Sequence, residues 1–148
     1  MNFDTGSILL IKDYKLPTTI KDKFFIVIGT ESNEANLLSM TTTQVYFNTS
    51  LLKHGIIQDR NLSIYCFQKD KVIGENGFSF RKNTFVSHYS NIHRFENQKL
   101  STLNVEYMDC LTKNEVLELV YSFYKYKGTK NKHKKLFEKI ISDLTKQN

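Results

Sequence analysis

The sequence predicts a mostly β protein with helices at its C-terminal end, and two observations support that prediction. Short apolar runs separated by turn residues recur from Ile8 to Leu100 and indicate six or seven short strands. From Thr112 onward, apolar residues recur at helical spacing instead. Many short strands with short connections are typical of a small antiparallel barrel. We therefore expect an α+β fold, with the barrel and a covering helix in residues 1–128 and a basic helix in residues 129–148.

The size and composition of the chain fit one folded domain. Its 148 residues are 40% hydrophobic and 13% aromatic, which is enough for a packed core. No basic leader precedes Ile8, and no apolar run approaches the roughly 18–20 residues that span a bilayer. We therefore expect a soluble, cytoplasmic protein with no membrane partner. Cys66 and Cys110 lie far apart in apolar surroundings, which favours free thiols over a zinc site or a disulfide.

The centre of the chain predicts two neighbouring buried strands. Phe24 to Gly29 is an apolar run rich in β-branched and aromatic residues, and Asn36 to Met40 is a second apolar run. Polar, turn-prone residues separate them, so a hairpin is expected. The second strand ends in Thr41, Thr42 and Thr43, followed by Gln44, and Val45–Phe47 could extend it.

A basic cluster, Lys21 and Lys23, begins the first of these strands. A hairpin brings this cluster close to the threonines that end its partner strand, and cations with hydroxyls at one sheet edge can bind a phosphate. The alternative is that the threonines are ordinary strand formers and the lysines are solvated.

Further strands are expected on both sides of this hairpin. They cover Ile8–Ile11, Leu62–Phe67, Phe78–Phe80, Thr84–Val86 and the first part of Asn91–Leu100, which continues into a helical turn. Lys15–Lys21 is expected to be a loop, and Asn76-Gly77 a tight turn that needs positive φ. Asn48 or Ser50 is expected to cap a helical turn that ends at Gly55.

Two helices are predicted after Thr112. Thr112 and Glu115 match a capping box, and an apolar stripe continues from there to Gly128. The second helix, about Lys132 to Thr145, has one apolar face. It could pack on the first helix as a helical hairpin or serve as a docking element, and packing is the default.

The positive charge of the chain lies in this last segment. Residues 125–148 hold eight lysines and two acidic residues, which accounts for the whole net charge of +6. A localised basic tail favours a phosphate-rich or acidic partner. A solvated lysine-rich helix is the alternative.

The order of these signals resembles the MazF/PemK family of toxin endoribonucleases. The matching segments are Gly6–Ile11, Lys23–Gly29, Ser39–Thr42, Phe80–Val86 with Asn91–Leu100, and Leu111–Val116. The resemblance covers roughly residues 6–124. It implies an SH3-like barrel capped by helices, usually dimeric, that cleaves single-stranded RNA without a metal or other cofactor.

The resemblance also assigns roles to particular residues. By position, Lys23 stands for the family's catalytic arginine and Thr41 for its catalytic threonine. In the family, the RNA 2′-hydroxyl attacks the adjacent phosphorus; Thr41 would then bond a phosphate oxygen, and Lys23 would stabilise negative charge or assist proton transfer. This sequence departs from the pattern because lysine is a single point charge where arginine offers a planar fork.

Further residues are expected to contact RNA. They are Lys21, Thr42, Thr43, Gln44, Arg81, Lys82, His93 and Arg94. The spacing of His88 and His93 places at most one of them in the cleft. The resemblance favours His93 as the proton-transfer group, because it falls near a position where the family has an arginine. Aromatic residues such as Phe78, Phe80 and Tyr89 could stack on unpaired bases, although most aromatic residues must fill the interior of so small a barrel.

Three functions stay open at this point. The leading one is a toxin of a toxin–antitoxin system, held in check by an acidic or amphipathic antitoxin segment that fills the cleft. The second is a catalytically weakened barrel that binds nucleic acid or protein within a regulatory or phage-defence complex. The third is a structural subunit of such a complex, in which the basic helix is an interface.

Overall fold

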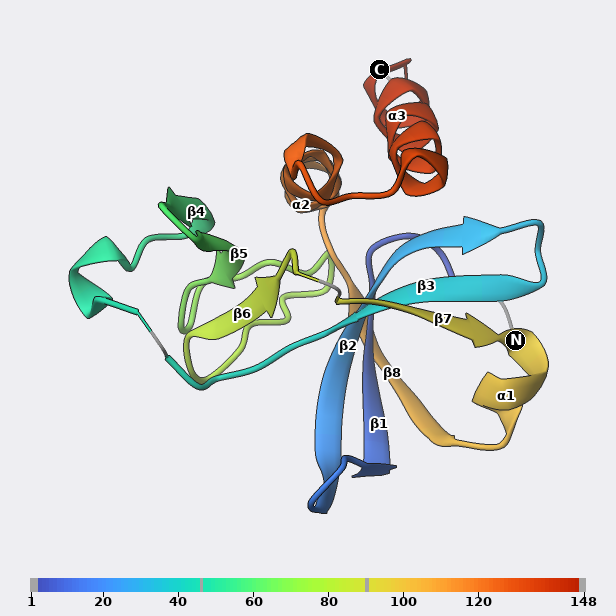
Figure 1. Ribbon diagram of the computed structural model, residues 1–148. Coiled ribbons are helices and arrows are strands. Elements are labelled where there is room, and N and C mark those ends of the chain that lie inside the picture. The colour runs from blue at the N-terminus through green and yellow to red at the C-terminus, as the bar shows by residue number, and fades with distance from the viewer. Residues whose placement is uncertain (1–2, 46, 90, 147–148) are drawn as a thin grey trace.

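The computed structural model describes residues 3–45, 47–89 and 91–146 and contains two antiparallel sheets (Figure 1). The larger sheet has the strand order β7-β3-β2-β1-β8, and the smaller has the order β4-β5-β6. The strands of the larger sheet are β1 (Ser7–Lys15), β2 (Ile20–Glu31), β3 (Ala35–Met40), β7 (Ile92–Glu96) and β8 (Asn104–Cys110). Those of the smaller sheet are β4 (Gly55–Asp59), β5 (Leu62–Phe67) and β6 (Thr84–Ser87).

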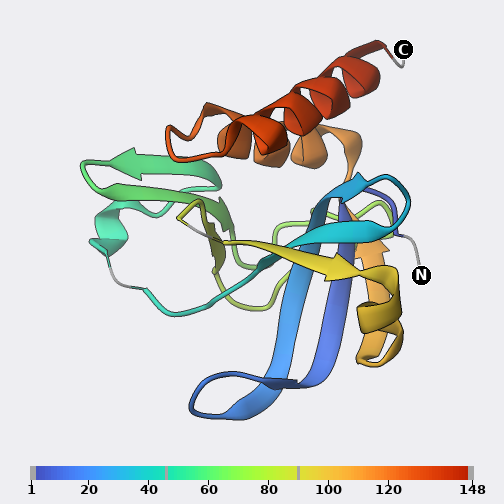
Figure 2. The ribbon, with the colours of Figure 1, turned by 45° about the vertical axis from the view of Figure 1, so that its right-hand side comes forward.

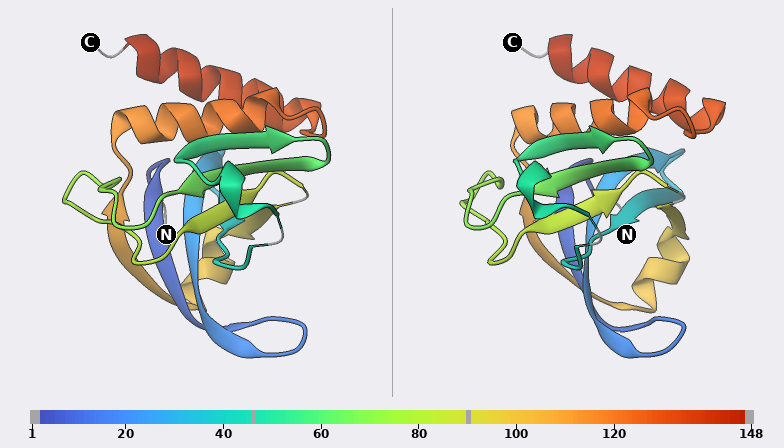
Figure 3. Two further views of the ribbon diagram at one scale, coloured as in Figure 1. Left: turned by 90° about the vertical axis from the view of Figure 1, so that its left-hand side faces the viewer. Right: turned by 60° about the vertical axis from the view of Figure 1, so that its left-hand side comes forward.

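The helices occupy two places in the structure. The short α1 (Asn97–Ser101) follows β7, and the 3₁₀ helix η1 (Thr49–Leu51) precedes β4. The longer α2 (Lys113–Lys125) and α3 (Asn131–Lys146) pack against each other, with α2 beside the β4–β5 hairpin (Figures 2 and 3). The C-terminal basic helix therefore lies on the body of its own chain, as the helical-hairpin prediction requires.

Strand β2 lies in the middle of the larger sheet because both of its faces are apolar. Ile26 and Ile28 point into a core between the sheets and the long helices, which also contains Phe123 and Phe137. Phe25 and Val27 alternate with them and face a second core, on the opposite side of the sheet. A strand that is buried on both faces reads as one continuous apolar run, as this one does.

The two sheets are joined at two places. The Thr42 amide donates to the Phe85 carbonyl at 2.9 Å, and the Phe85 amide donates back at 2.8 Å. A second bridge pairs Gly74 with Leu111. The sheets are not closed into a barrel over the described residues, so the structure supports an α+β fold of antiparallel sheets with C-terminal helices and leaves the predicted barrel without confirmation.

Most of the predicted elements are confirmed. The strands expected around residues 8–11, 24–29, 36–40, 62–67, 84–86 and 92–96 are present, as are both long helices. The Asn76-Gly77 turn is also present, with Gly77 at φ +91°. Asn48 caps η1 by accepting a hydrogen bond from the Ser50 amide at 3.0 Å.

Several local predictions differ from the structure. The stretch Phe78–Phe80 forms no strand, because Phe78 and Phe80 pack as ring contacts rather than along a ladder. The predicted loop Lys15–Lys21 is present but shorter, at residues 16–19, since β1 and β2 pair as far as Lys15 and Ile20. Strand β3 ends at Met40, so Val45 and Phe47 do not extend it, and Tyr46 lies outside the described residues. Strands β4 and β8 were not foreseen.

The predicted capping box at the start of α2 is only half correct. Thr112 does cap the helix, accepting from the Glu115 amide at 3.4 Å. The Glu115 carboxylate does not return a bond, because the Thr112 amide already donates to the Ile73 carbonyl at 2.9 Å. The carboxylate instead accepts from Tyr65 and His54.

Two general expectations concern thiols and membranes. Both cysteines are free, and burial raises the pKa of the Cys66 thiol to about 11. Within the described ranges, no helix combines the length and apolar character needed to cross a membrane.

Candidate functional site

The candidate site is built around the segment that leaves β3, residues 41–44. The Thr41 amide donates to the Phe24 carbonyl at 3.0 Å, which continues the β2–β3 pairing by one residue. The next residue, Thr42, pairs with Phe85 of β6 and so carries the chain from the larger sheet to the smaller one. A cavity lies on each side of this crossing segment, and Thr41 and Thr43 line both.

The first cavity, here called the lysine cleft, has a volume of about 360 Å³. Its walls come from the β1–β2 hairpin, the crossing segment and the chain between β6 and β7. The lining residues are Leu16, Lys21, Lys23, Met40, Thr41, Thr42, Thr43, Gln44, Ser87, Tyr89 and Asn91. Six of the ten predicted site residues therefore meet in one cleft.

Lys21 and Lys23 give the lysine cleft its charge. They are two residues apart on β2, so they project from the same face of the strand. Partial burial, and then the nearby positive charge of Lys21, lower the pKa of Lys23 below its usual value. Among the described residues, no acidic side chain lines this cleft and neither lysine forms an ion pair. Two like charges placed together without a counter-ion favour the binding of an anion.

The three threonines differ in what their hydroxyls do. The Thr41 hydroxyl donates to the Phe24 carbonyl at 3.1 Å, and the residue is only 5% exposed. The Thr42 hydroxyl accepts from the Gln44 amide at 3.1 Å and shapes the turn. Thr43 is exposed and lines both cavities. The hydroxyl best placed to donate to a ligand is therefore that of Thr43, two residues after the one that the resemblance designates.

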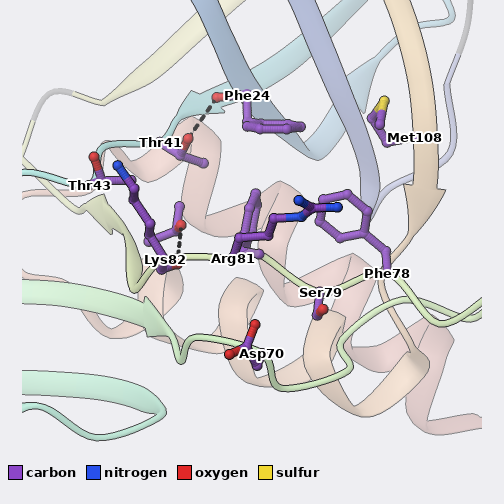
Figure 4. Close-up of a pocket in the computed structure, with 11 residues that line it drawn as sticks. Phe24, Thr41, Thr43, Asp70, Phe78, Ser79, Arg81, Lys82 and Met108 are labelled. Atoms are coloured by element: carbon purple, nitrogen blue, oxygen red, sulfur yellow. Dashed lines mark hydrogen bonds between the residues drawn. The ribbon is translucent and has the colours of Figure 1, made fainter.

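The second cavity, here called the phenylalanine pocket, has a volume of about 680 Å³ (Figure 4). Its apolar wall consists of Phe24, Phe78, Phe80 and Met108. The three rings meet edge to face, with centroids 5.1–6.0 Å apart. The polar rim carries Thr41, Thr43, Asp70, Ser79, Arg81, Lys82 and Thr84.

The two cations of the phenylalanine pocket extend across its mouth. In Figure 4 the Arg81 guanidinium reaches toward Phe78, and the Lys82 amine points toward Thr43. Both side chains are exposed. Asp70, also exposed, is the one acid among the described residues that line this pocket. Arg81 and Lys82 thus line the phenylalanine pocket, on the other side of the crossing segment from Lys21 and Lys23.

The remaining predicted residues lie elsewhere. His93 packs against Phe25 and Phe95 with ring centroids 6.2 and 6.4 Å away, and burial lowers its pKa. Arg94 pairs with Glu31 at 3.5 Å and with Glu96 at 3.3 Å. Neither residue lines the lysine cleft or the phenylalanine pocket, because β7 places them along the outer edge of β3.

His88 is a core residue. It is 3% exposed, with Nδ1 2.7 Å from the Ser63 hydroxyl and Nε2 2.8 Å from the Ser122 hydroxyl. Because Ser122 donates its own proton to the Leu119 carbonyl, His88 donates from Nε2 and accepts at Nδ1. Burial lowers the pKa of His88 to about 4, and the Ser63 backbone carbonyl, which acts as a hydrogen-bond acceptor, opposes part of this shift. A neutral, fully bonded imidazole fits a structural role.

Several lining residues were missed by sequence reasoning. Asn91 anchors the lysine cleft, since its amide donates to the Ser39 hydroxyl at 2.8 Å and to the Met40 carbonyl at 3.0 Å. Met108 reaches the phenylalanine pocket from β8, a strand whose alternation was not recognised. No local signal marks Asn91, whereas the polar–apolar alternation over residues 104–107 could have indicated the start of β8.

A second group of polar side chains lies under α2, and is here called the Glu115 cluster. The Glu115 carboxylate accepts from the Tyr65 hydroxyl at 2.7 Å and from His54 Nε2 at 2.7 Å. His54 in turn accepts at Nδ1 from the Gln68 amide at 3.0 Å. Burial, followed by the Glu115 charge, raises the pKa of Tyr65. No cavity described here is lined by Tyr65 or Glu115, so the cluster is a packed structural element.

Comparison with other proteins adds no assignment. No protein-family model matches the chain, and neither characterised proteins nor solved structures give a significant match. Over the described ranges, no three His, Cys, Asp or Glu side chains come together in a way that could hold a metal ion. The site must therefore be judged on its own geometry.

Proposed function

We propose that the protein is a toxin-type endoribonuclease that binds single-stranded RNA in the lysine cleft and cleaves it by 2′-hydroxyl attack. One observation carries the proposal: two lysines that have no acidic partner within the described part of the chain share a cleft with three consecutive threonines. Cations and hydroxyls in a partly desolvated cleft are the groups that hold and polarise a phosphodiester. The neighbouring phenylalanine pocket and its two cations extend the same surface.

Each group has a role in this reaction. Lys21 and the Thr43 hydroxyl hold the non-bridging oxygens of the phosphate. Lys23, whose pKa is lowered, takes the proton of the 2′-hydroxyl when neutral. The 2′-oxygen forms a bond to phosphorus as the bond to the 5′-oxygen breaks, and the leaving oxygen takes a proton from the Lys21 ammonium or from water. The products are a 2′,3′-cyclic phosphate and a 5′-hydroxyl end.

The fold is compatible with a partly opened SH3-like barrel of the MazF/PemK kind. The bridges Thr42–Phe85 and Gly74–Leu111 join the sheets at two points, as strand pairing around a barrel would. An acidic antitoxin segment suits the lysine cleft by charge, and a homodimer is the assembly that the resemblance implies. Both partners are proposals that copurification and the mass of the protein in solution test directly.

Cleavage of a labelled single-stranded RNA in the presence of EDTA tests the proposed reaction. The unmodified chain should release a cyclic phosphate and a 5′-hydroxyl end, identified by mass spectrometry. Lys23→Ala should lower the rate by about 10²–10³, the usual effect of removing one preorganised group. Thr43→Val should also slow cleavage, whereas Lys99→Ala, an exposed control on α1, should not. Intact RNA, or a rate insensitive to Lys23→Ala, contradicts the proposal.

A binding module without catalysis is the second candidate, and one observation favours it. Among the described residues that line the lysine cleft there is no histidine and no carboxylate, so the candidate proton acceptors are lysine and Tyr89, and alkylammonium groups and phenols ordinarily lose their protons only well above neutral pH. This candidate predicts salt-sensitive RNA binding without products. Induced expression in bacteria separates the two functions, because only the nuclease arrests growth in a manner that Lys23→Ala abolishes.

A further inference from the structure

The phenylalanine pocket has features that the cleavage reaction does not require. Phe24, Phe78 and Met108 are only partly buried, and they expose an apolar surface beside the crossing segment. Phe80, 4% exposed, closes the wall behind them. The volume of about 680 Å³ lies within the range of small-molecule sites, roughly 300–1,000 Å³. Exposed aromatic surface arranged around a cavity of this size indicates a binding site for a flat apolar group.

The rim of the pocket restricts the chemistry of that group. Arg81 and Lys82 are exposed cations at the mouth, opposed by Asp70 alone among the described lining residues. The Thr43 and Ser79 hydroxyls add hydrogen-bonding groups. A purely apolar side chain would leave these groups without a partner. A ligand with flat apolar faces, polar edges and an attached negative charge satisfies both wall and rim, and a nucleotide has that combination.

The connection between the two cavities indicates how such a nucleotide would lie. Thr41 and Thr43 line both cavities, so a phosphate at Thr43 is within reach of Lys82 on one side and faces the lysine cleft on the other. We infer that the phenylalanine pocket takes one unpaired base of a single-stranded RNA whose backbone continues along the lysine cleft. This inference rests on the proposed function and adds to it a single base-binding position, with Phe78 as the contact of the base and Arg81 as a contact of the attached phosphate.

Binding of oligonucleotides that cannot be cleaved tests the pocket apart from catalysis. The probe is a fluorescent hexanucleotide with 2′-O-methyl groups, in six versions that each lack the base at one position. Fluorescence anisotropy with the full chain should show one position at which the missing base weakens binding by about 5- to 150-fold, the range for loss of one stacked base. The other positions should change affinity by less than about threefold. This comparison uses the unmodified protein and needs no variant.

Variants then assign the sensitive position to the pocket. Phe78→Leu keeps an apolar side chain but removes the ring face, so the intact probe should bind as weakly as the probe lacking the sensitive base. Arg81→Gln should weaken both probes. The matched control is Arg60→Gln, an exposed arginine outside both cavities, and it should leave the position profile unchanged. Circular dichroism establishes that each variant is folded.

The outcomes separate this inference from the proposed function. A flat position profile, or a sensitive position that survives Phe78→Leu, overturns the base-binding assignment even if RNA is cleaved, and would leave the pocket to an apolar side chain of a protein partner. A sensitive position that Phe78→Leu removes supports the assignment even if no RNA is cleaved. Failure of every probe to bind overturns it.

Discussion

The lysine cleft and the Glu115 cluster both concentrate polar side chains on a small protein, but they differ in whether those groups have partners. Under α2, His54 and Tyr65 both bond to the Glu115 carboxylate, and His54 also bonds to the backbone. In the lysine cleft, Lys21 and Lys23 face each other's charge without an acidic partner among the described residues. Satisfied polar groups stabilise a fold, whereas like charges held together without a partner favour a ligand.

The difference is informative because residue type alone suggests the opposite conclusion. Histidine, tyrosine and glutamate are the residues usually associated with catalysis, yet here they form a buried, fully bonded cluster. Lysine and threonine are common on any surface, yet here they line the cleft. The distinction depends on burial and on partners, and the following predictions test it.

The largest expected effect concerns the Glu115 carboxylate. Glu115→Ala leaves His54 without its carboxylate partner and the Tyr65 hydroxyl with only its long bond to Glu118, so the free energy of unfolding should fall by roughly 3–5 kcal/mol. Denaturant titration measures it. Glu118→Ala is the matched control, because Glu118 is exposed and accepts from Tyr65 only at 3.3 Å; its effect should stay below about 1 kcal/mol. Equal effects of the two substitutions would show that the cluster is not a stabilising unit.

The next effect is the pH dependence that His88 confers. Its pKa is about 4 in the folded protein against 6.5 for the free side chain, so between these values the unfolded chain binds more protons. Stability should therefore decrease as the pH falls from 6.5 to 4, by about 3 kcal/mol from this residue. Unfolding measured at several pH values should show a shallower slope for His88→Gln. An unchanged slope would assign the pH dependence to other groups.

In the lysine cleft, a substitution should weaken RNA binding and leave the stability of the fold nearly unchanged. Lys23→Met removes a half-buried charge that is repelled by Lys21, so the free energy of unfolding should rise slightly or change by less than about 1 kcal/mol. The same substitution should weaken binding of the non-cleavable RNA probe by about 10- to 100-fold. A large loss of stability without loss of affinity would place Lys23 with the structural residues.

The smallest expected effect is a change in the salt dependence of RNA binding, and it distinguishes the lysine cleft from the basic helix α3 as the RNA-binding surface. If the cleft lysines contact phosphates, removing one should reduce the slope of log affinity against log salt by about 0.7. Lys21→Gln should show that reduction. The double substitution of Lys135 and Lys139 by Gln, on the exposed side of α3, should leave the slope unchanged. The reverse result would favour the basic helix as the nucleic-acid surface.

Sequence reasoning predicted the elements better than the site because strands and helices depend on local pattern. The sequence alone indicates the apolar runs of β2 and β3, the apolar stripe of α2 and the Thr112 cap of that helix. The hairpin inferred from the two apolar runs placed Lys21 and Lys23 close to the three threonines, and all five residues line one cleft. The resemblance also predicted that His93 and Arg94 belong to the RNA-binding site. The β3–β7 register places both residues outside the two cavities.

By itself the sequence determined the α+β class, most strand and helix positions, the free thiols and the location of the net charge, because each depends on neighbours along the chain. Only the tertiary structure decided that Thr41 bonds to the backbone while Thr43 lines both cavities. It also decided that Glu115 binds His54 and Tyr65, and that α3 packs on its own chain. These outcomes depend on which segments, far apart in the sequence, pack against each other, because that packing decides which hydrogen-bond partner a polar side chain finds.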